Sequence, residues 1–129
     1  MMKGMGVLAF NVGTFRAEGR VGESGQSVVV TWTGECDLSA VEQLEAFFDQ
    51  LHATATDATP PREVVLDLHE VSFMNSSCLS KLVAWLARIR DLDAAARYKV
   101  RIRSNPKVAW QKRSLRAVQF FAPELVTVV

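Results

Sequence analysis

The sequence of 129 residues contains only two cysteines, two histidines and no long apolar run. Cys36 and Cys78 are isolated, and the absence of CxxC or HxxxH spacing argues against a structural zinc site. So few cysteines also fit a reducing compartment, and we expect a cytoplasmic protein. No stretch of 18 apolar residues could span a bilayer, and residues 1–7 lack the apolar core of a signal peptide. We therefore expect no membrane insertion.

The overall composition is that of a globular protein, with 49% hydrophobic and 22% charged residues. A chain of this length can bury roughly two-thirds of the surface that its unfolded form exposes. It can therefore build a core without disulfide bonds or a metal ion. We expect one domain over residues 1–129, with neither a metal site nor a cofactor.

The formal net charge of +1 hides an asymmetry along the chain. Residues 1–80 carry four basic and eleven acidic side chains, whereas residues 81–129 carry eleven basic and three acidic ones. Seven basic residues fall close together: Lys99, Arg101, Arg103, Lys107, Lys112, Arg113 and Arg116. Such a cluster could bind nucleic acid or anionic lipid, or be a solvated face. Few aromatic residues interleave with it, so we favour steering of a charged protein partner, or association of two copies as a homodimer.

Hydrophobic periodicity indicates alternating strands and helices. We predict strands at residues 7–12 and 27–33, paired as a hairpin, and then a helix from Leu38. Its apolar stripe runs from Leu38 to Leu51, with a capping box from Ser39 to Glu42. The apolar run at 63–68 predicts a central strand, and a second helix follows Asn75 and stops near residue 93.

The last third of the chain continues the alternation. Residues 98–103 alternate strictly, which predicts a strand whose basic face meets water. Residues 104–106 predict a helix start, with the helix running to about Phe121, and residues 125–128 predict an edge strand or a docked tail. The whole order predicts an α/β fold, with a mixed sheet of about four to five strands packed with three to four helices.

Two strand-to-helix junctions, residues 34–38 and 73–79, are where chemistry would gather in such a sheet. We expect both at the same edge. Asn75 is a candidate N-cap, which places Ser76 and Ser77 in the first helical turn, where free N–H groups and the helix dipole favour an anion. A phosphoryl group there would add about −1.5 to −2 charges. Helix capping alone also explains these residues.

Three segments together resemble the STAS domain of bacterial anti-sigma factor antagonists: residues 34–38 (GECDL), 64–68 (VVLDL) and 72–79 (SFMNSSCL). The resemblance covers roughly residues 27–122. It implies a mixed sheet packed with helices and a serine that a partner kinase, itself an anti-sigma factor, phosphorylates. A PP2C-type phosphatase would remove the phosphate. The unphosphorylated antagonist would bind the kinase and free the sigma factor.

Carried over by position, the resemblance implies Ser76 as the phosphorylated residue, with Ser77 as the alternative. It places Asp37 in the neighbouring acidic loop, although Asp37 could equally cap the following helix. The implied partner-binding surface contains Glu35, Asp37, Asn75, Ser76, Ser77 and Cys78. Asn75 replaces the family's usual Asp, which keeps the cap and removes a charge that would repel a phosphate. Cys78 replaces the usual Gly and adds a thiol near the expected docking surface.

Three functions follow from these patterns. The first is a non-enzymatic regulatory interaction domain switched by phosphorylation of Ser76. The second is a STAS-like scaffold or regulatory subunit that is never phosphorylated, and the third is a sensor of a small anionic ligand or nucleotide. We do not expect an enzyme, because His52 and His69 stand in no recognisable catalytic arrangement. Cys36 and Cys78 could approach each other as a redox pair if the two junctions are adjacent.

Overall fold

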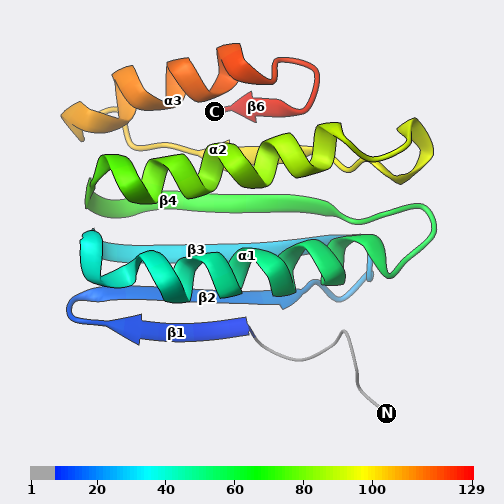
Figure 1. Ribbon diagram of the computed structural model, residues 1–129, viewed down its shortest axis with the longest axis horizontal. Helices are drawn as coiled ribbons and strands as arrows, with labels where there is room; N and C mark the ends of the chain where they lie inside the picture. The colour runs from blue at the N-terminus through cyan, green and yellow to red at the C-terminus, as the bar shows by residue number, and fades with distance from the viewer. Residues whose placement is uncertain (1–7) are drawn as a thin grey trace.

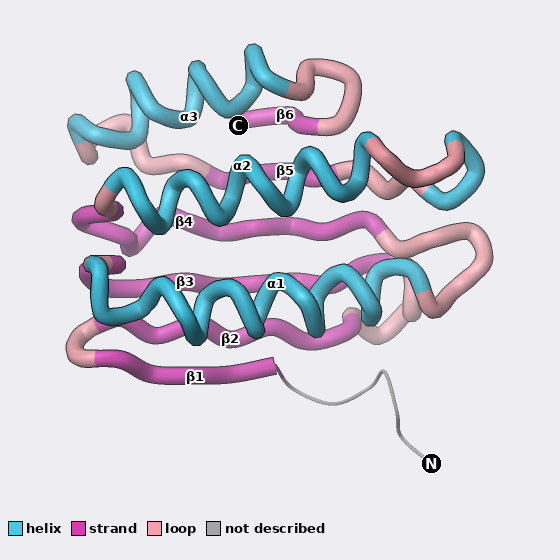
Figure 2. Tube along the Cα trace, viewed as in Figure 1, coloured by secondary structure: helices cyan, strands magenta, loops and turns pink. Residues whose placement is uncertain are grey.

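The computed structural model describes residues 8–129 and contains one six-stranded sheet (Figures 1 and 2). The order of the strands across the sheet is the same as their order along the chain. The first three strands are antiparallel, and β3 to β6 are parallel. The strands are β1 (Leu8–Val12), β2 (Phe15–Val21), β3 (Ser27–Cys36), β4 (Glu63–Met74), β5 (Val100–Arg103) and β6 (Val126–Val128). The predicted mixed α/β fold is confirmed, with slightly more strands than expected.

Three helices join the parallel strands. They are α1 (Val41–Thr56), α2 (Ser76–Arg90) and α3 (Ala109–Phe121), with short 3₁₀ turns η1 (Leu38–Ala40) and η2 (Ala94–Ala96). Because successive parallel strands are added on the same side, right-handed crossovers place all three helices over one face of the sheet. Figure 1 shows this single helical layer in front of the strands. None of these helices is long and apolar enough to cross a membrane, a finding limited to residues 8–129.

The core lies between the helices and the covered face of the sheet. Its centre is aromatic: Trp32 on β3 contacts Phe47 and Phe48 of α1 edge to face, and Phe48 stacks on Trp85 of α2 at 4.9 Å between ring centroids. Such pairs contribute about 0.5–1.5 kcal/mol each beyond the area that they bury. No helix of the described residues covers the opposite face of the sheet, and Arg101 and Arg103 of β5 are exposed there, as predicted for the basic face of that strand.

The predicted hairpin between residues 7–12 and 27–33 is wrong, because the chain forms another strand, β2, between them. Ala17 and Gly19 are the small inward residues of β2, and they weaken the apolar alternation that marks a strand. A Cβ at Gly19 would lie 3.2 Å from Val30 and 3.6 Å from Phe47, so packing requires a small residue. Val7, which the first predicted strand included, and the rest of residues 1–7 lie outside the described residues.

Two helix starts differ from the prediction. No capping box forms at Ser39 and Glu42, because Asp37 instead accepts the Ser39 N–H at 3.0 Å and caps η1, after which α1 begins at Val41. Leu38 consequently leaves the apolar stripe and is 67% exposed. The third helix begins at Ala109, because the Asn105 side chain accepts the Lys107 N–H at 3.0 Å and forms a turn first.

Candidate functional site

The two strand-to-helix junctions meet at one edge of the sheet, where β3 and β4 end. The Asn75 N–H donates to the Cys36 carbonyl at 2.9 Å, and the Cys78 thiol donates to the Asp37 carbonyl at 3.2 Å. These bonds fix the loop after β3 against the first turn of α2. In Figure 1 the helices α1 and α2 both begin at this same end of the sheet, on the left. We call residues 35–38 and 73–78 the junction surface.

Gly34 shapes the first half of the junction surface. Its φ is +92°, in the region that favours glycine, and a Cβ there would collide with the backbone carbonyl of Thr14. The close approach lets the Thr14 hydroxyl accept the Glu35 N–H at 3.2 Å. The loop between β1 and β2 therefore supports the chain that leads to Asp37.

Asn75 starts α2 as the sequence predicts. Its backbone is extended, and its side-chain oxygen accepts the Cys78 N–H at 3.0 Å, which satisfies the third amide of the helix. Its carbonyl accepts the Leu79 N–H at 3.0 Å, the first bond of the helix. The amides of Ser76 and Ser77 occupy the first two helical positions, which have no acceptor within a helix. The side chain of Ser76 is exposed and that of Ser77 is half-buried.

The junction surface carries acidic charge without local compensation. Glu35 and Asp37, together with Glu42 in the first turn of α1, form no ion pair within residues 8–129. The Ser39 hydroxyl, followed by its backbone N–H, lowers the pKa of Asp37, so this exposed carboxyl is ionised at neutral pH. Two apolar side chains are also exposed here: Leu38 by 67% and Phe73 by 46%.

The two cysteines lie together beneath this surface. Both are fully buried, and the thiols lie close enough to affect each other's pKa. Burial, and next the neighbouring Cys78 thiol, raises the pKa of the Cys36 thiol far above its usual range, and burial also raises that of Cys78. Contrary to the contact surface drawn from the sequence, the Cys78 side chain faces inward and supports the loop through Asp37.

Residues 20–100 match the family model described as "Mlab, STAS domain". The chain belongs to the STAS domain family. The junction surface is thus part of a STAS domain, and residues 34–38, 64–68 and 72–79, which carried the resemblance, fall within the matched range. A search of curated proteins found no match.

Several solved structures share the fold of this chain. An anti-sigma factor antagonist from Mycobacterium paratuberculosis has a TM-score of 0.59 at 20% identity, with 83% of each chain covered. A protein of the DUF3478 family with a SpoIIAA-like fold, from Shewanella loihica, also scores 0.59, at 13% identity over 93% of this chain and 89% of that one. The phosphorylated form of the Bacillus cell fate determinant SpoIIAA scores 0.52 at 19% identity, with 96% and 91% covered. At these identities the likeness concerns the fold.

Sequence reasoning did not identify Gln111, whose buried side chain joins α3 to β4 by hydrogen bonds. Beyond Asp67, β5 no longer pairs with β4, so carbonyls of β4 lose their strand partner. The fully buried Gln111 of α3 donates to the carbonyls of Leu68 at 2.6 Å and Val71 at 3.1 Å. Trp110 also donates to Val71, at 3.0 Å. Only the tertiary structure reveals this role, because a glutamine on a helix ordinarily reads as a surface residue.

The remaining candidates lie away from the junction surface. His52 is half-buried on α1, with its Nδ1 2.7 Å from the Tyr98 hydroxyl, whereas His69 is exposed beside Glu70. Within the described chain, the principal hollows are lined by α3, by α1 with α2, and by residues near η2. The junction residues line none of these hollows, which gives the ligand-sensor hypothesis no support from shape.

Proposed function

We propose that this STAS domain is a non-enzymatic regulatory module of the cytoplasm whose junction surface binds a protein partner and is switched by phosphorylation of Ser76. By the family resemblance, the partner is a serine kinase that also acts as an anti-sigma factor, and a PP2C-type phosphatase resets the switch. One observation carries the proposal: Ser76 is exposed at the first position of a capped helix, directly beside the loop of Asp37.

Helix geometry supports a phosphate at this position. The free amides of the first turn and the positive end of the helix dipole stabilise an anion at a helix N-terminus. Asn75 caps the helix with a neutral side chain, so it adds no charge that would oppose the phosphate. The Ser77 side chain is half-buried, which favours Ser76 as the accessible hydroxyl.

Charge explains how phosphorylation would act as a switch. The unmodified junction surface holds the carboxylates of Glu35 and Asp37 beside the exposed apolar side chains of Leu38 and Phe73, a combination suited to protein contact. Phosphorylation would add about −1.5 to −2 charges to the centre of a surface that is already acidic. A partner fitted to the unmodified surface would then face a large repulsive and desolvation cost.

The decisive experiment is intact-mass analysis with site mapping on the protein isolated from its own cells. We expect one phosphoryl increment that maps to Ser76 and is lost in Ser76→Ala. Ser77→Ala and Ser80→Ala are matched controls in the same helix and should retain the increment. Partner pull-down with Ser76→Asp should show weaker binding than wild type. A Ser76→Ala protein with unchanged partner regulation would contradict the switch.

One feature favours a second candidate, in which the domain is a scaffold or regulatory subunit that is never phosphorylated. Asn75 stands where the antagonist pattern has Asp, and a kinase that reads this position would find an amide in place of a carboxylate. The same experiment separates the two functions. No phosphoryl increment under growth or stress, together with a partner whose affinity is indifferent to ATP and to Ser76→Asp, would establish the scaffold.

A further inference from the structure

A second surface, distinct from the junction surface, lies on α3. The buried side of this helix is formed by Gln111, Leu115 and Val118, followed by Ala122 at its C-terminal end. Positions 109, 113, 116 and 120 each lie two residues before one of these positions, which is about 200° around an α-helix. They therefore lie on the side of the helix that faces away from the sheet. We call Ala109, Arg113, Arg116 and Phe120, with the adjacent Lys112, the outward face of α3.

The cations of this face differ from most others in the protein because they lack acidic partners. Within residues 8–129, seven lysine or arginine side chains form ion pairs, and those of Arg97 and Lys99 donate to backbone carbonyls. Five others do neither: Arg16, Lys107, Lys112, Arg113 and Arg116. Four of these five thus lie between positions 107 and 116. The helix itself contains no acidic residue.

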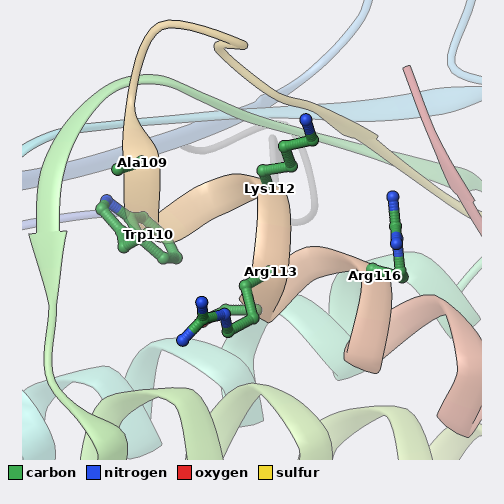
Figure 3. Close-up of a pocket in the computed structure, with 6 residues that line it drawn as sticks. Ala109, Trp110, Lys112, Arg113 and Arg116 are labelled. Atoms are coloured by element: carbon green, nitrogen blue, oxygen red, sulfur yellow. The ribbon is translucent and has the colours of Figure 1, made fainter.

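Apolar surface accompanies these cations. Phe120 is 79% exposed, the highest value among the large hydrophobic side chains of the described chain. An open hollow of about 600 Å³ is lined by Trp110, Lys112, Arg113 and Arg116 together with Ala109 and Ser114. Figure 3 shows the basic side chains projecting from the helix in separate directions around it. A second hollow of about 520 Å³ continues past Arg116 to Phe120 and Pro123.

We propose that the outward face of α3 docks an acidic amphipathic segment of a partner protein. Two carboxylates one helical turn apart would meet Arg113 and Arg116, which are themselves one turn apart, and an apolar side chain would cover Phe120. From Lys112 to Phe120 the helix rises about 12 Å, so a segment of two to three turns spans the face. The match is one of charge complementarity combined with an aromatic contact at the C-terminal end of the face.

The same observations argue against the other occupants. A membrane-bound helix buries a row of large apolar residues in the bilayer, and this face offers only Phe120. Nucleic-acid binding depends on neutralising many backbone phosphates. In this part of the described chain only four cations are unpaired, Lys107, Lys112, Arg113 and Arg116, because Arg101 and Arg103 on β5 are paired with Glu63 and Asp67. A protein segment needs no such extended track of charge.

The test is site-specific photocrosslinking in the cells from which the protein comes. A photoreactive phenylalanine analogue replaces Phe120, and in a matched control it replaces Val29, which is exposed on the open face of the sheet. We expect a crosslink from position 120, but not from position 29, to a partner segment of net negative charge. The crosslink should be lost in Arg113→Glu/Arg116→Glu, and should persist in Arg16→Glu and in Ser76→Ala.

A synthetic peptide of the mapped segment then gives the affinity by fluorescence anisotropy. We expect binding to weaken about tenfold or more in Arg113→Glu/Arg116→Glu and to weaken with rising salt, with Arg16→Glu close to wild type. All variants should keep the wild-type urea midpoint, because the changed side chains are exposed. Absence of a crosslink, or a crosslink to a neutral or basic segment, to lipid, to nucleic acid or to a second copy of this chain, would overturn the proposal.

Discussion

Replacing Gln111 by leucine should destabilise the protein more than any comparable change on α3. The side chain donates to the carbonyls of Leu68 and Val71 and accepts the Asn105 N–H at 2.7 Å. Leucine has a similar volume, so the Gln111→Leu variant removes these bonds without opening a cavity. Val71 would keep its bond from Trp110, whereas the Leu68 carbonyl and the Asn105 amide would lose their side-chain partner.

The size of the destabilisation depends on how well water can replace the lost hydrogen bonds of the Leu68 carbonyl and the Asn105 amide. Leu68 is fully buried, so its unpaired carbonyl costs about 1–3 kcal/mol, whereas Asn105 is half-buried and its amide costs about 1 kcal/mol. The expected loss in the free energy of unfolding is therefore about 2–4 kcal/mol. With a urea m-value of about 1.5 kcal/mol/M, a loss of about 3 kcal/mol lowers the midpoint by about 2 M.

The assay is urea unfolding followed by circular dichroism, with Gln119→Leu as the matched control. Gln119 lies on the same helix, is half-buried, and makes no side-chain hydrogen bond within the described chain. Its variant should stay within about 0.5 kcal/mol of wild type. A loss below about 1 kcal/mol for Gln111→Leu would refute the reasoning, since it would mean that the freed β4 carbonyls do not depend on this side chain.

Three further predictions concern acid stability, thiol reactivity and Gly34 in β3. Burial, and then the charge of Arg88, lowers the pKa of His52, whose neutral Nδ1 can accept the Tyr98 hydroxyl. The unfolded state therefore binds the proton more readily, and the free energy of unfolding should fall as the pH drops below about 6.5. Urea midpoints measured across this pH range should fall less steeply for His52→Gln. Both buried thiols should resist a disulfide reagent at mildly alkaline pH and react only after unfolding in guanidinium; rapid reaction of the native protein would contradict their burial. Gly34→Ala should cost more than about 3 kcal/mol or prevent folding, and a near-wild-type melting temperature would show that β3 can relax around the added Cβ.

Sequence patterns predicted a strand or helix correctly where neighbouring residues alone determine the structure. The apolar run that begins β4, the Asn75 cap and the helix that follows it are predicted from neighbouring residues, and the structure confirms each. The adjacency of the two junctions also followed, because parallel strands bring their carboxyl ends to one edge. The strand β2 was not predicted because its inward residues Ala17 and Gly19 are small and do not produce an apolar alternation. Gly19 is small because Val30 and Phe47 pack against it, and hydrophobic periodicity carries no information about such contacts.

For the candidate site, the sequence by itself determined the residue types and their spacing: a capped helix start with Ser76 in its first turn, an acidic loop, and an excess of basic residues toward the C-terminus. Tertiary structure alone decided which of these groups are available to a partner. It buried Cys78 under Asp37, exposed Leu38 and Phe73, and paired Arg101 and Arg103 while leaving Arg113 and Arg116 free within the described residues. The physical reason is that burial and ion pairing depend on neighbours brought together from distant parts of the chain.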